Sequence, residues 1–122
     1  MAKILVVDDD ADVRRAMARI LSAAGHQVSE AGDGRGALAL YRADPADLII
    51  TDMYMPHADG IEVVARLRDE FPNARIIVTS GGGQLDRADV LDMAQRLGAQ
   101  RALPKPVERA DLLAAVDGVL RG

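Results

Sequence analysis

The stretch Ile49-Ile50-Thr51-Asp52 decides how this chain is interpreted, because a short apolar run ends there on a carboxylate. Branched aliphatic residues in so short a run are typical of a buried strand. Three other apolar runs end in the same way: residues 4–7 lead to Asp8 and Asp9, residues 76–79 to Ser80, and residues 102–104 to Lys105. This repeated placement predicts a site built where several strands end.

Composition limits the classes of protein to consider. The 122 residues predict a single domain spanning 1–122, and the 49% hydrophobic content is enough for one core. A formal net charge of −4 argues against general nucleic-acid binding, and the absence of cysteine excludes disulfides and thiolate metal sites. No apolar run approaches the roughly 20 residues of a membrane span, and the N-terminal run is too short for a secretion signal. We expect a soluble cytoplasmic protein without membrane insertion.

Strand and helix patterns alternate five times along the chain. Strands are predicted at residues 3–7, 26–30, 47–51, 75–79 and 100–103. The first helix is expected to begin after Asp10 and to end at Gly25, and the last to span residues 107–120. A fourth helix at residues 85–97 has the thinnest apolar stripe. The alternation predicts an α/β fold, a doubly wound five-stranded parallel sheet with its strand ends on one edge.

The residues at that edge have complementary chemistry. Asp8, Asp9 and Asp52 would repel one another at short range, and Mg²⁺ is the natural cation for such oxygen ligands. An aspartate carboxylate is an established nucleophile for phosphoryl groups. Lys105 would neutralise one phosphoryl oxygen and Ser80 would bond another.

Each of these residues also has an ordinary explanation when taken alone. Asp8, Asp9 and Asp10 could simply be acids at a helix N-terminus, where the helix dipole favours them. Asp52 fits a turn, Ser80 a loop and Lys105 the surface. The specificity comes from the ordered set at four strand ends.

That ordered set resembles the receiver domain of bacterial two-component response regulators. The resemblance covers essentially the whole chain and implies the flavodoxin-like strand order 2-1-3-4-5. It is carried by Asp8-Asp9, Asp52 with Met55-Pro56 and Gly60, Ser80 before a small residue, and Lys105-Pro106.

The resemblance implies a role for each site residue. Asp52 would be the phosphoacceptor, supplied by a histidine kinase or histidine phosphotransfer protein in a phosphorelay. Asp8, Asp9, Asp52 and the backbone carbonyl of Tyr54 would be the Mg²⁺ ligands. Ser80 would move toward the phosphoryl group and Lys105 would pair with it, and the bond before Pro106 is usually cis in the family.

The family also implies a switch rather than a metabolic enzyme. Phosphorylation would alter a surface made by the fourth helix, fifth strand and fifth helix, and a downstream protein would bind that surface. The receiver itself would be a monomer or a phosphorylation-dependent dimer. Only self-phosphorylation and slow autodephosphorylation are expected. Two positions depart from the common pattern: Ala102 stands where an aromatic residue is frequent, and Val107 where phenylalanine is common.

Two rival interpretations remain open from the sequence. Asp8-Asp9-Asp10 also fits the start of a haloacid-dehalogenase-like phosphatase, in which Asp8 would be the nucleophile and Asp10 the general acid. Ser80 and Lys105 would fit its next motifs, but no acidic pair follows Lys105 and there is no room for a cap domain. The second rival is a pseudo-receiver that binds partners without being phosphorylated, although its site residues are intact.

Overall fold

The computed structural model describes residues 2–53, 60–81, 92, 95, 96 and 98–122. Its elements are β1 (Lys3–Val7), α1 (Ala11–Ala23), β2 (Gln27–Ala31), α2 (Gly34–Ala43), β3 (Leu48–Asp52), α3 (Gly60–Glu70), β4 (Ile76–Gly81), β5 (Arg101–Lys105) and α5 (Arg109–Arg121). The predicted helix at 85–97 falls mostly outside the described residues. Asp92, Gln95 and Arg96, the described residues within it, are helical.

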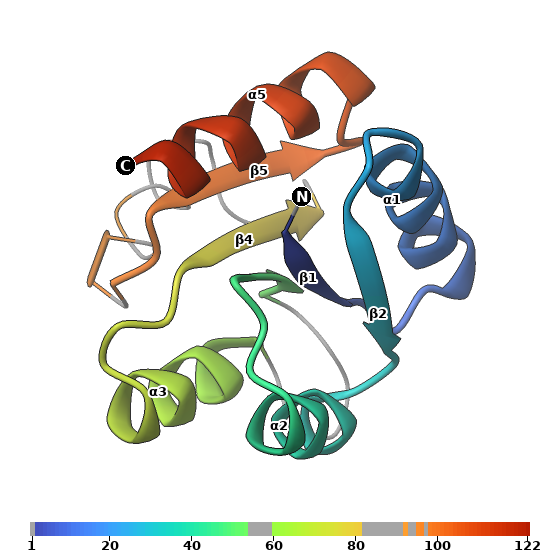
Figure 1. Ribbon diagram of the computed structural model, residues 1–122. Helices are drawn as coiled ribbons and strands as arrows, with labels where there is room; N and C mark the ends of the chain where they lie inside the picture. Colours follow the sequence, from blue (N-terminus) through green and yellow to red (C-terminus); the bar gives the residue numbers. More distant parts are fainter. Residues whose placement is uncertain (1, 54–59, 82–91, 93–94, 97) are drawn as a thin grey trace.

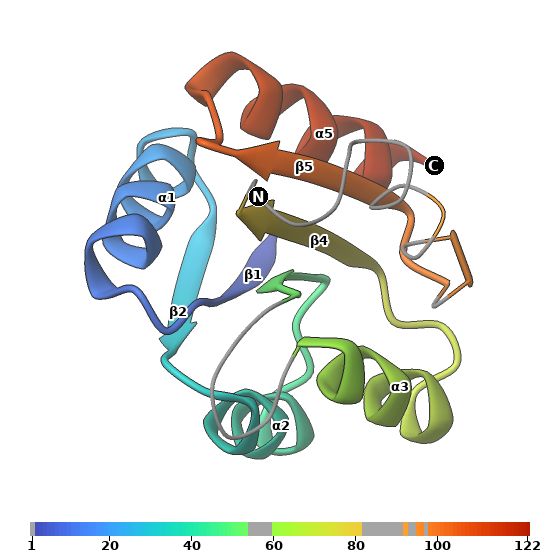
Figure 2. The same ribbon diagram turned by 180° about the vertical axis from the view of Figure 1, so that it is seen from behind.

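The five strands form one parallel sheet in the order β2-β1-β3-β4-β5, which confirms the predicted fold class and strand order. In Figures 1 and 2, α1 and α5 cover one face of the sheet, and α2 and α3 cover the other. Each face has its own buried apolar cluster. Ile49 belongs to the cluster on the α2/α3 face and Ile50 to the one on the α1/α5 face, so β3 is buried on both sides.

The helix boundaries follow the local sequence signals. The Asp10 side chain accepts hydrogen bonds from the backbone amides of Asp12 and Val13, which confirms it as the cap of α1. After the same helix, Gly25 adopts a φ of 96°, a conformation that favours glycine. These two signals fix where α1 begins and ends, and therefore where its side chains meet the sheet edge.

The last strand is longer than the sequence indicated. We predicted a strand ending at Leu103, but β5 continues through Pro104 to Lys105, paired with β4. Because β5 is an edge strand, the missing amide hydrogen of Pro104 costs no ladder bond on its open side. Lys105 is therefore held within the sheet. The Lys105–Pro106 bond is cis, as the resemblance implied.

The strand register brings the predicted residues to one edge. Val7, the last residue of β1, pairs with Thr51, and Asp52 at the end of β3 pairs with Thr79 in β4. One step further, Gly81 pairs with Lys105. Asp8, Asp52, Ser80 and Lys105 consequently lie at the carboxyl edge of adjoining strands.

Two buried threonines provide a test of how hydroxyl groups are accommodated here. Thr79 Oγ1 is buried and has no hydrogen-bond partner in the described part of the chain, whereas Thr51 Oγ1 donates to the Asp52 carbonyl at 3.2 Å. Replacing Thr79 by Val removes a polar group that folding leaves unpaired. Thr79→Val should therefore raise the free energy of unfolding by about 1 kcal/mol, and Thr51→Val should lower it by about 1 kcal/mol. Urea unfolding followed by circular dichroism checks both; a destabilised Thr79→Val would contradict the prediction.

Candidate functional site

The site is an acidic corner at the carboxyl edge of β1 and β3. Asp8 is fully buried, Asp52 is 5% exposed and Asp9 is exposed. Each offers one carboxylate oxygen, and these three oxygens all lie within 4.8 Å of one another. The structure therefore brings together the three aspartates that the sequence singled out.

Asp8 is fixed by contacts on several sides. Its amide donates to the Ala31 carbonyl at 3.2 Å, and its Oδ1 accepts from the Asp10 amide at 2.9 Å. Its Oδ2 is buried and accepts no well-aligned hydrogen bond among the described residues, although Lys105 Nζ lies 2.7 Å away as an ion pair. An oxygen in this condition still has a lone pair to offer to a cation.

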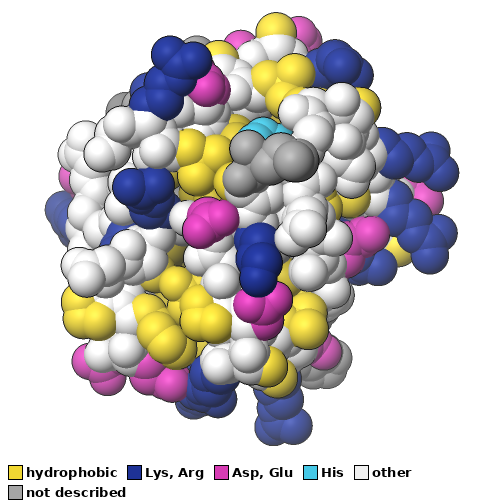
Figure 3. All heavy atoms as spheres, in the orientation of Figure 1, with side chains coloured by type: hydrophobic (Ala, Val, Ile, Leu, Met, Phe, Trp, Pro, Cys, Tyr) yellow, Lys and Arg dark blue, Asp and Glu magenta, His cyan; other side chains and the backbone are white. Residues whose placement is uncertain are grey.

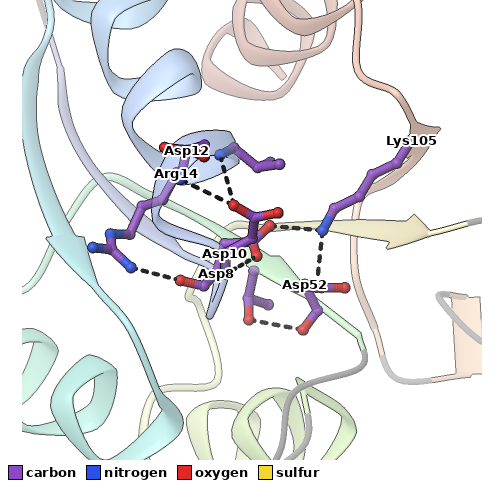
Figure 4. A network of polar contacts seen from close by, with 8 residues as sticks. Asp8, Asp10, Asp12, Arg14, Asp52 and Lys105 are labelled. Atoms are coloured by element: carbon purple, nitrogen blue, oxygen red, sulfur yellow. Dashed lines mark hydrogen bonds and ion pairs between the residues drawn. The ribbon is translucent and has the colours of Figure 1, made fainter.

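Lys105 is the cation already present in the corner. Figure 4 shows its side chain reaching from the end of β5 to both Asp8 and Asp52, with Nζ 2.9 Å from Asp52 Oδ2. Burial alone would lower the pKa of Lys105, but the close contacts with Asp8 and Asp52 and their negative charges outweigh it, and the net pKa is raised. The ammonium thus stays charged in the site at neutral pH and stabilises it.

The acidic corner has more negative than positive charge. Among the described residues, the formal charges of these three carboxylates and of the Lys105 ammonium sum to −3 + 1 = −2. A divalent cation would neutralise that charge, and the all-oxygen ligand set is the kind that Mg²⁺ prefers. The buried Asp8 Oδ2 and the close spacing of the aspartate oxygens fit such an ion.

Ser80 lies beside this corner, in β4. It is 4% exposed within β4 and makes no hydrogen bond with Asp52 in this structure. Its neighbour Thr79, not singled out from the sequence, is the residue that pairs with Asp52 across the strands. Tyr54, the expected carbonyl ligand, lies outside the described residues.

Sequence reasoning also missed Arg14, which lies behind the corner. Its Nη1 donates to the backbone carbonyl of Asp8 at 2.9 Å, and its Nε donates to Glu30 Oε1 at 3.0 Å (Figure 4 shows the first contact). An arginine on the first turns of a helix has many ordinary explanations. Its target here is a main-chain atom, which leaves no pattern in the sequence.

The wider surface agrees with the composition. On the face in Figure 3, Lys and Arg side chains are interspersed with Asp and Glu rather than gathered into one basic surface. Within the described residues, no helix is both long and apolar enough to span a bilayer.

Comparison with known proteins shows which family the sequence of this chain matches. The response regulator receiver domain model matches residues 4–117. The chain is 37% identical over 121 residues to the transcriptional regulatory protein CpxR of Klebsiella pneumoniae, covering 99% of this chain and 50% of that protein. It is 41% identical over 120 residues to the response regulator MprA of Mycolicibacterium vanbaalenii, covering 98% and 50%. The chain thus spans about half the length of these curated relatives.

Solved structures give the same result. A response regulator receiver domain protein from Clostridium thermocellum superposes with a TM-score of 0.89 at 28% identity, covering 99% of this chain and 95% of that one. The Vibrio cholerae chemotaxis protein CheY4 superposes with a TM-score of 0.87 at 31% identity, covering 98% of each chain. Both likenesses extend over the whole fold, including the edge that carries the acidic corner.

The bridging position of Lys105 generates a prediction about metal removal. With the metal chelated, Lys105→Met leaves the three carboxylates without their ammonium, and the free energy of unfolding should fall by about 2 kcal/mol, less than for a fully buried pair. The same change removes a competitor for Asp8, so Mg²⁺ should raise the melting temperature more in the variant than in the parent. Thermal melts in EDTA and in excess Mg²⁺ measure both effects.

Lys3→Met is the matched control for that experiment. Lys3 pairs with Asp44 at 3.0 Å, but both side chains are at least half exposed, at 50% and 69%. Such a pair contributes little, so the control should melt close to the parent under both conditions. A Lys105→Met protein as stable as the control in EDTA would contradict the stabilising role of the ammonium.

Proposed function

This chain belongs to the response regulator receiver domain family of two-component systems, and from that premise we propose that Asp52 accepts the phosphoryl group. The observation that carries the proposal is the ion pair of Lys105 Nζ with Asp52 Oδ2 at 2.9 Å, inside an acidic corner that fits a divalent cation. A buried carboxylate that contacts a lysine ammonium and belongs to a candidate metal site suits nucleophilic attack on phosphorus.

The proposed step is a phosphoryl transfer between two defined atoms. An oxygen of Asp52 forms a bond to phosphorus while the bond from phosphorus to the donor breaks. The donor nitrogen of a phosphohistidine, or the carboxylate oxygen of acetyl phosphate, leaves with the bonding electrons, and a leaving imidazole takes up a proton. Lys105, already in contact with Asp52, then faces a dianionic group and pairs with one of its oxygens.

Mg²⁺ is proposed as the cofactor, supplying charge neutralisation when bound. Asp8, Asp9 and Asp52 would hold it together with the backbone carbonyl of Tyr54. Asp8 is rigidly placed by its contacts with Ala31 and Asp10, whereas Asp9 lies at the exposed rim. Asp9, as the exposed member of the three, would be the ligand that a hydrated ion meets first.

Ser80 and the β5–α5 side are the proposed output of the switch. A phosphoryl dianion on Asp52 would give the Ser80 hydroxyl an acceptor, whereas no hydrogen bond joins Ser80 to the unmodified Asp52. Ala102 has no aromatic ring to swing inward; it is half-buried and packs against the α2/α3-face cluster. Val107 packs against the other cluster. Output here would therefore be carried by main-chain shifts of β4 and β5 rather than by an aromatic side chain.

The partners follow from the same premise. A histidine kinase or histidine phosphotransfer protein would supply the phosphoryl group, and a downstream protein would read the surface around the fourth helix, β5 and α5. We place the protein in the cytoplasm, as a monomer or a phosphorylation-dependent dimer, with residues 1–122 as one receiver domain. Its chemistry serves a signal, so metabolic turnover of a substrate is not part of the proposal.

The phosphatase alternative requires Asp8 as the nucleophile, and no finding supports it. Asp8 is fully buried, and its Oδ1 accepts a hydrogen bond from the Asp10 amide. Asp10, its supposed general acid, instead caps α1. The pseudo-receiver alternative predicts binding without phosphorylation, and the experiment below distinguishes it.

Phosphorylation is tested by intact mass spectrometry after incubation with acetyl phosphate and Mg²⁺. The parent should gain one phosphoryl group and Asp52→Asn none, because an amide is not a nucleophile for this transfer. Asp8→Asn should still be modified at high Mg²⁺, but more slowly, because it keeps the acceptor and loses one metal ligand. A parent that stays unmodified, or an Asp52→Asn protein that is modified like the parent, would refute the proposal.

A further inference from the structure

Arg14 connects three elements at the back of the acidic corner. It lies in α1, its Nη1 donates to the Asp8 carbonyl at the end of β1, and its Nε pairs with Glu30 in β2 at 3.0 Å. The Arg14 side chain is only 17% exposed and that of Glu30 is 37% exposed. The guanidinium thus donates to two acceptors from two different nitrogens held in one rigid plane, a geometry that the ammonium of a lysine does not have.

The surrounding chain leaves space for that guanidinium. Gly32 follows β2, and a Cβ placed on it would lie 3.3 Å from Arg14 Nη1, closer than most side chains tolerate. The Arg14 backbone is anchored as well, because its amide donates to the Asp10 carbonyl at 2.9 Å in the first turn of α1. Arg14 therefore occupies a defined position between α1, β1 and β2.

The Asp8 carbonyl is the atom that sets the direction of Asp9. It belongs to the peptide plane that joins Asp8 to Asp9, so a hydrogen bond to it restrains the rotation that would swing Asp9 away. The Asp9 side chain is exposed and has no hydrogen-bond or ion-pair partner among the described residues. One of its carboxylate oxygens nevertheless lies within 4.8 Å of one carboxylate oxygen of Asp8 and one of Asp52. The backbone must hold it there.

We infer that Arg14 is a positioning residue for divalent-cation binding, acting through the Asp8 carbonyl on the placement of Asp9. This deepens the proposed function, because it assumes that the acidic corner takes the cation. Glu30 offsets the charge of the guanidinium, which would otherwise repel a metal ion from the corner. Arg14 itself does not contact the ion or the phosphoryl group.

Charge and position predict effects of opposite sign, which makes the inference testable. If Arg14 acted only through its charge, Arg14→Met would remove a nearby cation and the corner would bind a divalent ion more tightly. If it positions Asp9, the same variant should bind about tenfold more weakly, the usual scale for losing a group that orients metal ligands. Arg14→Lys keeps the charge and one donor and should fall between Arg14→Met and the parent.

The measurement is Mn²⁺ affinity, with free Mn²⁺ counted by electron paramagnetic resonance. Arg15→Met is the matched control, because Arg15 is the adjacent, exposed arginine of the same helix. All proteins are compared at a temperature where circular dichroism shows them folded. Weaker binding by Arg14→Met and Arg14→Lys, with Arg15→Met like the parent, supports the inference. Unchanged or tighter binding by both Arg14 variants overturns it, as does equal weakening in the control.

Phosphorylation by acetyl phosphate is the second readout. At saturating Mn²⁺, Arg14→Met should be modified at close to the parent rate, since Asp52 and Lys105 are untouched, and at limiting Mn²⁺ it should lag about tenfold. A rate defect that saturating metal does not relieve counts against a role in cation binding. A parent that is never modified would defeat the proposed function, yet the Mn²⁺ affinities would still decide the role of Arg14.

Discussion

The ion pairs of Lys105 with Asp8 and Asp52 are the interaction on which the rest of this structure depends. Three carboxylates within 4.8 Å of one another are unstable without positive charge, and the ammonium at 2.7 and 2.9 Å supplies part of it. The remaining −2 is the reason that the corner suits a divalent ion. The same lysine therefore offsets part of the acidic charge in the unmodified protein, and it would pair with the phosphoryl group that we propose for Asp52.

The requirement for these contacts explains the construction of the sheet edge. Lys105 reaches the aspartates because β5 extends through Pro104, and an edge strand tolerates the missing amide hydrogen there. Asp52 is buried at the end of β3, whose residues are covered on both faces. A parallel sheet thus brings together groups that are far apart in sequence and sets their order through strand register.

The sequence was informative where the structure depends on local side-chain chemistry. The strand runs, the Asp10 cap and the turn at Gly25 each follow from local chemistry, and the strand alternation predicted which acids would meet. The sequence was less informative where main-chain atoms act. Pattern alone ended β5 two residues early. It also did not show that Thr79 is the residue paired with Asp52, because the register between two strands is set by the tertiary fold.

Asp8 shows how the fold converts helix packing into site geometry. Its carboxylate is engaged by Lys105 from β5, while its carbonyl is engaged by Arg14 from α1. The position of Arg14 depends on the seating of α1, which is set by the burial of Met17 and Leu21 against the sheet. If Arg14 positions the corner as we infer, the apolar periodicity of α1, which by itself predicts only a covering helix, would also determine how accurately the corner presents its oxygens to a cation.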